Sequence, residues 1–415
     1  MNTSRILRTT NVVLLLMGYQ RHWFEKKSHR FRLSLPSVVY IFVLGVVYTA
    51  CFSQHFDESS STLKVLEDIS PFLFGLIRVQ LALGAKAFAY AIYSSVKSVG
   101  AINSLLKALP SRNSQFTQDE ASAYLLLTST FGILFCFAAY IAYEMKFELP
   151  PLPDAMLGMA LLLPHFILAG SVRLYTVLSW LSRGQLKELK KNAGEELRAN
   201  LTKDPGNIAS ALFTVSTESL ENLKTKLEIL EANFCIFAQS LKHSMLLLFA
   251  MHANCLLGGF YTLTYYWNTW YVLFEDRKRR IFYAANASIY ASIASDYICL
   301  MVVLFMMENE RRNFIEAIDL LLAQRKLFSK NLRPIAKDLR GVLKKKCFKF
   351  GGPCRPNIIY VSLVSFCDLI ENSFHRRYLQ MVCLQIIIIT LIVTVHYLED
   401  EISLLKEEFR STDDN

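Results

Sequence analysis

The sequence alternates between mostly apolar blocks and charged stretches. Each block holds roughly 18 to 28 residues, and an apolar helix of about 20 residues suffices to cross a hydrocarbon core of about 30 Å. The chain of 415 residues is 53% hydrophobic, above the roughly 45 to 50% of soluble domains, and the blocks carry the surplus. This pattern predicts an all-α integral membrane protein that lies in the lipid bilayer.

Seven blocks reach the length of a membrane span, six of them within 35–308. For residues 1–34, which precede them, we expect a cytoplasmic segment with a short amphipathic helix on the inner leaflet. Two long polar regions, 182–241 and 309–380, separate the later spans, and a tail, 399–415, follows the last. The expected spans are 35–52, 70–93, 122–143, 155–181, 242–267, 281–307 and 381–398.

The distribution of Lys and Arg predicts the orientation, because positive charges next to spans are retained in the cytoplasm. With the amino terminus inside, the cytoplasmic segments carry 33 Lys and Arg and the opposite segments carry 8. One basic run, Arg277 to Arg280, falls on the outer side. Removing a span to move it would place the more basic region 309–380 outside. We therefore predict a cytoplasmic amino terminus, seven spans and an extracellular carboxyl terminus.

Both polar regions contain helical patterns that lead into the following spans. Before the fifth span, large apolar residues recur every three or four positions, at Leu220, Leu223, Leu227, Leu230, Phe234 and Phe237. This spacing places them on one helical face. We expect one long helix that begins in the cytoplasm and continues into the membrane.

Familiar catalytic motifs are missing from the sequence. It contains no G-x-x-x-x-G-K-[ST] phosphate loop, no H-E-x-x-H and no G-x-S-x-G elbow. The histidines share no metal-ligand spacing, so we expect no enzyme, no cofactor and no metal site. The net charge of +10 lies beside the spans and not in one patch, which favours a membrane over a nucleic acid as partner.

Ionisable residues inside the spans are candidates for function, because a charge at bilayer depth is costly unless it faces protein, water or a partner. They are Arg78 and Lys86 in the second span, Arg173 in the fourth and Asp296 in the sixth. A structural ion pair or a side chain that reaches the interface explains them equally well. The sequence leaves both interpretations open.

Aromatic residues gather where the outer halves of the spans are expected to meet. An interfacial aromatic belt is one explanation, and an apolar pocket with a few polar groups is the other. The residues that we expect to line such a pocket are Arg78, Phe137, Tyr140, His165, Tyr261, Tyr265, Tyr290 and Asp296.

The seventh block, 381–398, is nearly free of polar groups. Thr390, Val393 and Tyr397 share one helical face, and Thr394 adjoins it. A single helix of this kind can simply face lipid. Several copies around a symmetry axis form a narrow hydrophobic constriction of the kind that gates by dewetting.

The seven spans, the inside amino terminus, the long cytoplasmic extensions and the terminal span together resemble the insect gustatory receptor family and its wider chemoreceptor superfamily. Its members carry a T-Y-(five hydrophobic)-Q-F signature in the last span. Here Thr390-Leu391 is followed by Ile392 to His396 and Tyr397-Leu398, so only the threonine agrees.

The resemblance implies a ligand-gated cation channel in the plasma membrane, as a homotetramer or a heteromer with related receptors. The cytoplasmic helices would form an anchor region, a small-molecule tastant would bind among the second to sixth spans, and the last span would line the pore. Thr390, Val393, Thr394 and Tyr397 are the pore candidates.

Three other functions share parts of this pattern. A receptor-like scaffold or heteromeric partner would keep the fold without conducting. A G-protein-coupled receptor has seven spans but places its amino terminus outside. A secondary transporter often shows repeats with broken spans in matching positions, whereas Pro164 and Gly258-Gly259 do not occupy matching positions.

Overall fold

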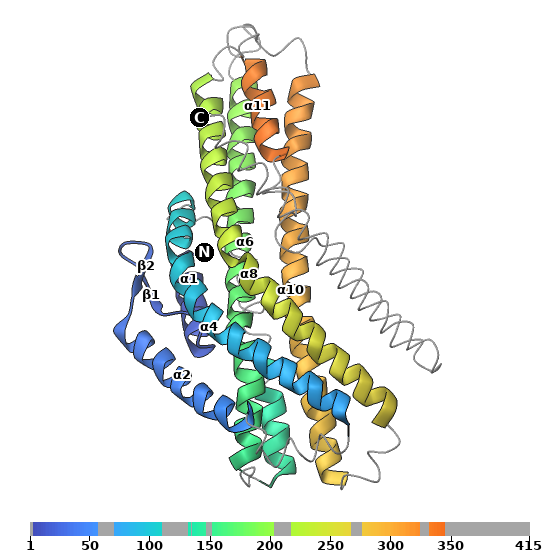
Figure 1. Ribbon diagram of the computed structural model, residues 1–415. Coiled ribbons are helices and arrows are strands. Elements are labelled where there is room, and N and C mark those ends of the chain that lie inside the picture. The colour runs from blue at the N-terminus through green and yellow to red at the C-terminus, as the bar shows by residue number, and fades with distance from the viewer. Residues whose placement is uncertain are drawn as a thin grey trace, which may run out of the picture. The chain divides into compact units, whose positions relative to one another are not determined.

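The computed structural model (Figure 1) describes residues 3–56, 70–109, 132–133, 135–146, 152–202, 217–266, 276–323 and 332–344. The expected third span is described only from residue 132 onward. The expected seventh span, 381–398, lies outside the described residues, and so do the tail and the pore candidates Thr390, Val393, Thr394 and Tyr397.

The described chain is almost entirely helical, as expected. Five of its helices are long and apolar enough to cross a membrane, and they cover most of the expected first, second, fourth, fifth and sixth spans. A two-stranded hairpin, which the sequence did not predict, precedes them. The elements are α1 (Thr3–Leu16), β1 (His22–Glu25), β2 (Arg30–Leu33), α2 (Leu35–Phe56), α4 (Pro71–Ala108), α6 (Leu152–Thr202), α8 (Thr217–Tyr266), α10 (Asp276–Ala323) and α11 (Leu332–Lys344).

Helix α4 begins at a residue pair suited to a helix start. The Ser70 side chain accepts a hydrogen bond from the backbone N–H of Leu73 at 3.3 Å, and Pro71 occupies the first turn. A serine cap satisfies one of the free N–H groups at a helix start, and a proline there loses no helical hydrogen bond. With 38 residues, α4 is longer than one span requires.

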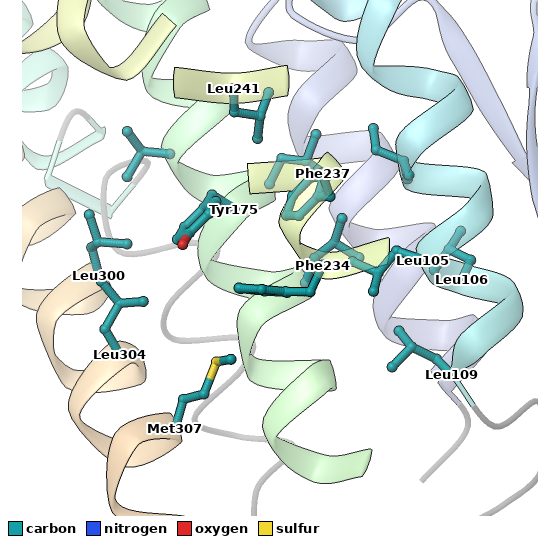
Figure 2. Close-up of a cluster of buried hydrophobic side chains, with 14 of the residues drawn as sticks. Leu105, Leu106, Leu109, Tyr175, Phe234, Phe237, Leu241, Leu300, Leu304 and Met307 are labelled. Atoms are coloured by element: carbon teal, nitrogen blue, oxygen red, sulfur yellow. The ribbon is translucent and has the colours of Figure 1, made fainter. Parts of the chain in front are cut away.

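Helix α8 is continuous from Thr217 to Tyr266, which confirms the single long helix predicted from the leucine and phenylalanine stripe. From Leu223 to Phe237 the stripe is buried. Figure 2 shows Phe234 and Phe237 of α8 with Tyr175 of α6, and the rings of Tyr175 and Phe237 stack at 5.8 Å. Leucines of α4 and the α10 residues Leu300, Leu304 and Met307 belong to the same core.

The core continues along parts of three helices beyond the expected spans, which we call the helical extension. It comprises 182–202 of α6, 217–241 of α8, 308–323 of α10 and all of α11. Helix α11 packs against α8 and α10 (Figure 1) and buries Leu339 and Leu343. Burial of one such side chain contributes about 1.5 to 3 kcal/mol where the alternative is water.

Ion pairs and a side-chain-to-backbone hydrogen bond join the helices of the helical extension. Lys190 of α6 lies 2.9 Å from Glu310 of α10, and Lys224 of α8 lies 2.8 Å from Asp338 of α11. Arg311 of α10 pairs with Glu308 and donates to the backbone oxygen of Leu343 at 2.9 Å. These contacts join α6 to α10, α8 to α11 and α10 to α11, so the extension is tied together by charge as well as by its core.

Helix α1 packs against α6 and buries Ile6, Leu7 and Leu14. The helix ends at Leu16, and Gly18 in the following turn has a φ of 75°, the left-handed conformation that glycine adopts without a Cβ penalty. The chain then turns so that Tyr19 meets Gly170 of α6, where a Cβ would lie 2.6 Å from the Tyr19 Cβ. The N-terminal segment is thus built into the helical core.

Candidate functional site

A chain of side-chain hydrogen bonds crosses α4, α6 and α8. The Asn254 Nδ2 donates to Gln80 Oε1 at 2.8 Å and to the backbone oxygen of Leu76 at 3.0 Å. The Gln80 Nε2 in turn lies 2.5 Å from His165 Nε2. We call Gln80, His165 and Asn254, together with His252, Cys255 and Tyr297, the polar network.

The directions of these hydrogen bonds are fixed by one backbone group. A carbonyl oxygen only accepts, so Leu76 requires the Asn254 amide nitrogen to point toward it. That nitrogen then faces the Gln80 oxygen, which turns the Gln80 nitrogen toward His165. An amide nitrogen only donates, so His165 Nε2 is the acceptor and its imidazole carries its proton on Nδ1.

The close approach of α4 and α6 positions this contact. Pro164 of α6 packs against Gly84 of α4, where an added Cβ would lie 3.1 Å from the Pro164 ring. Gly84 follows Gln80 by one turn, and Pro164 immediately precedes His165. The missing side chain therefore brings the two helices near enough for Gln80 to reach the imidazole.

His165 connects the polar network to α8 and α10. Its ring stacks on His252 with centroids 5.3 Å apart and an interplanar angle of 4°. The His252 Nδ1 lies 3.0 Å from the Tyr297 hydroxyl, and Cys255 Sγ lies 3.5 Å from His165 Nε2. Four helices thus contribute polar side chains to one connected group.

A buried ion pair joins Arg173 of α6 to Asp296 of α10, and the two side chains are only 1% and 5% exposed. Arg173 follows His165 by eight residues, about 12 Å along the helix. Charges at this depth require pairing, because desolvation of a lone one costs several kcal/mol. The ion-pair interpretation of these two residues is therefore correct.

Aromatic residues lie on the same helices toward their expected outer ends. The ring of Tyr261 in α8 lies 4.5 Å from that of Phe72 in α4. The Tyr290 hydroxyl of α10 occupies the place where a Gly259 side chain would be. Arg78 extends over the Phe74 ring, 5.4 Å from its centroid.

The expected pocket residues divide into two groups. His165, Tyr261, Tyr290 and Asp296 lie on the helices that contribute to the polar network or its flanks, and Arg78 is two residues before Gln80. Phe137 and Tyr140 belong to the segment 135–146, where the Tyr140 hydroxyl donates to Glu144 at 3.0 Å. The Tyr265 side chain lies outside the described residues.

Glu144 also forms an ion pair with Arg280, the last residue of the basic run that the positive-inside rule does not expect on the outer side. The Arg280 Nε and Nη2 both lie 3.1 Å from its two carboxylate oxygens. A bidentate pair of this kind holds an arginine firmly. One charge of that run is therefore matched by an acid that directly follows the expected third span.

Sequence reasoning missed Gln80, Asn254 and Tyr297, because the search was limited to charged residues, histidines and outer aromatic residues. Neutral amides at bilayer depth are also costly to bury without partners. A search for Gln and Asn within the apolar blocks would have found Gln80 and Asn254. Among the described residues, no three His, Cys, Asp or Glu side chains come together to hold a metal ion.

The fold and the polar network define a class, that of helical membrane proteins with a polar group buried between spans. Within the described ranges this class rests on the five apolar helices. The chain matches no family model and no curated protein.

Proposed function

We propose that the chain is a gustatory-type chemosensory receptor that acts as a ligand-gated cation channel. The observation that supports this proposal most is the hydrogen-bonded chain Asn254–Gln80–His165, which joins three helices in an otherwise apolar setting. A small molecule with hydroxyl or amide groups would bind by exchanging hydrogen bonds with these side chains.

Such an exchange has a mechanical consequence. Each hydrogen bond of the chain joins a different pair of helices, so a ligand that replaces one bond alters the spacing of two helices. The bonds are directional, and an unsatisfied amide in an apolar setting costs about 1 to 3 kcal/mol. Ligand binding is therefore favoured only if the ligand forms hydrogen bonds with both side chains whose mutual hydrogen bond it replaces.

Continuous helices also connect the polar network to the helical extension. Helices α6, α8 and α10 each run without interruption from the polar network into the helical extension. The Arg173–Asp296 pair couples α6 to α10 beside the polar network, because Asp296 directly precedes Tyr297. A shift at the polar network would move the extension, which the resemblance assigns to an anchor region beside the pore helix.

The pore remains assigned to Thr390, Val393, Thr394 and Tyr397 by the resemblance, in a homotetramer or a heteromer with a related receptor. The same proposal places the protein in the plasma membrane with its amino terminus inside. Tyr397 stands where the family has glutamine, and a tyrosine at the outer end would narrow the pore.

The test is whole-cell current recording during application of a panel of sugars, bitter compounds and other tastants. We expect a ligand-evoked cation current whose half-maximal ligand concentration rises about tenfold or more in Asn254→Leu, as loss of a hydrogen bond at the site predicts. The control is Asn233→Leu on the same helix, because the Asn233 amide donates a hydrogen bond to the Ile229 backbone oxygen of its own helix at 2.8 Å.

Two results would contradict the proposal. Equal effects of Asn254→Leu and Asn233→Leu at matched surface expression would remove the polar network from ligand binding. Tetramers at the cell surface that carry no current, alone or with a related receptor, would instead favour a non-conducting scaffold.

A further inference from the structure

A groove of about 650 Å³ lies between α2 and α4. One face of α2 forms its floor, from Val38 to Ser53 at three- and four-residue intervals, which is about 22 Å of helix. Most of its lining is apolar. It includes Val38, Phe42, Val46 and Ala50 of α2 with Phe88 and Ile92 of α4.

The shape and chemistry of the groove suit a hydrocarbon chain. Gly45 has no side chain, and a Cβ there would be 3.7 Å from the Phe88 ring, so the α2 backbone lies close to Phe88 at this point of the groove. The hydroxyl of Thr49 donates a hydrogen bond to the backbone oxygen of Gly45 at 2.8 Å. The groove therefore offers an occupant little to hydrogen-bond along its length.

Arg21 lines the same groove and supplies its positive charge. The Arg21 Nη2 donates to the backbone oxygen of Ile92 at 3.0 Å, which holds the guanidinium in place. Its Nε is buried and has no hydrogen-bond partner within the described part of the chain. Arginine has five N–H donors and remains charged, so the site is suited to an anion.

The surroundings of Arg21 add to this charge. The hairpin that follows exposes Lys26, Lys27 and Arg30, and its acid, Glu25, is paired with Arg32 at 3.0 Å. Asn103 of α4 holds the hairpin through both backbone groups of Phe31, at 2.8 and 3.1 Å. A fixed basic surface thus lies next to the cationic side of an apolar groove.

We propose that this groove holds an acyl chain of an anionic phospholipid, with Arg21 bound to the lipid phosphate. The predicted orientation puts Arg21 and the hairpin at the cytoplasmic leaflet, where anionic lipids attract basic segments. Exposed Trp23 is of the residue type enriched at the membrane interface. This inference does not rest on the proposed receptor function.

The test is native mass spectrometry of the full chain, purified in detergent with equal amounts of phosphatidylglycerol and phosphatidylcholine. We expect the wild type to retain phosphatidylglycerol selectively. Arg21→Gln is expected to reduce this retention roughly tenfold, because a charge-assisted hydrogen bond is lost, and Arg21→Lys by less. The matched control is Arg30→Gln, which removes an equal charge from the hairpin outside the groove.

A second variant tests the acyl-chain part and protects against misfolding of Arg21→Gln. Ala50 is exposed in the groove, so Ala50→Phe fills it with little disturbance of the core, and we expect it to abolish selective retention. Wild-type retention by Ala50→Phe would overturn the proposal. Equal losses in Arg21→Gln and Arg30→Gln, or equal retention of phosphatidylcholine by the wild type, would also overturn it.

Discussion

Arg173 of α6 and Asp296 of α10 form an ion pair whose side chains are 1% and 5% exposed. Removal of one partner leaves a buried charge without compensation, which costs about 3 to 5 kcal/mol. We therefore expect Arg173→Met and Asp296→Leu each to lower the unfolding temperature strongly. The double variant is expected to regain most of the loss, because it buries no charge.

The measurement for the ion pair is a double-mutant cycle of thermal unfolding in one detergent. Strictly additive losses would show that the two side chains do not stabilise each other. Arg312→Met is a suitable control, since Arg312 is largely exposed and pairs only with Glu308 along its own helix.

Neighbouring glycines on α8 are expected to respond oppositely to alanine. At Gly259 the added methyl group would occupy the position of the Tyr290 hydroxyl, whereas at Gly258 it would lie 3.7 Å from Leu76 Cδ1, an ordinary contact. Gly259→Ala is expected to displace α10 and lower stability by about 1 to 3 kcal/mol. Gly258→Ala is expected to be neutral or stabilising by up to about 1 kcal/mol.

Thermal unfolding and ligand-evoked current of these two glycine variants provide the measurement. If Gly259→Ala is as stable and as responsive as Gly258→Ala, the packing of Tyr290 against α8 is not as described.

The stacked pair Tyr175–Phe237 anchors the inner part of the core. Phe237→Ala would leave a large cavity at a fully buried position, with a cost of about 3 to 5 kcal/mol. The adjacent Ile236 is 54% exposed, so Ile236→Ala is expected to change stability by no more than about 0.5 kcal/mol. Chemical unfolding of both variants tests this contrast, and similar values would argue against the burial pattern of α8.

His22 of β1 is buried, and we expect it to make the hairpin sensitive to acid. Burial lowers the pKa of its imidazole, and the charge of Arg21 lowers it further. The folded pKa lies below the unfolded value of about 6.5, so the stabilisation is complete above pH 6.5 and is lost as the pH falls. We expect His22→Phe to reduce the loss of stability between pH 7 and 5.

Unfolding temperatures at a series of pH values provide the check. His29→Gln, at the hairpin turn, serves as the control. A wild-type pH profile in His22→Phe would exclude His22 as the source of the acid sensitivity.

Five of the spans and the long helix α8 were predictable because their signals are local. Apolar length predicts a span, and a stripe such as Leu223, Leu227 and Leu230 predicts one buried face. The hairpin was not predictable in the same way. Its strands have four residues each, and the backbone of Phe31 is satisfied by Asn103, which is 72 positions away.

The candidate site was predictable only residue by residue. Arg173 and Asp296 each stand out as charges within apolar blocks, yet their pairing depends on how α6 and α10 pack. Gln80 and Asn254 lie 174 positions apart, and nothing in the sequence indicates that their amides meet. Contacts between helices are set by tertiary packing, which a single sequence does not encode in any local pattern.

We propose a receptor with seven spans, an inside amino terminus and an outside carboxyl terminus. Its most direct test is antibody access to tags at both ends of the chain, in intact and in permeabilised cells. We expect the amino-terminal tag to stain only after permeabilisation and the carboxyl-terminal tag to stain in intact cells. An amino-terminal tag accessible in intact cells would contradict the account and favour a G-protein-coupled receptor.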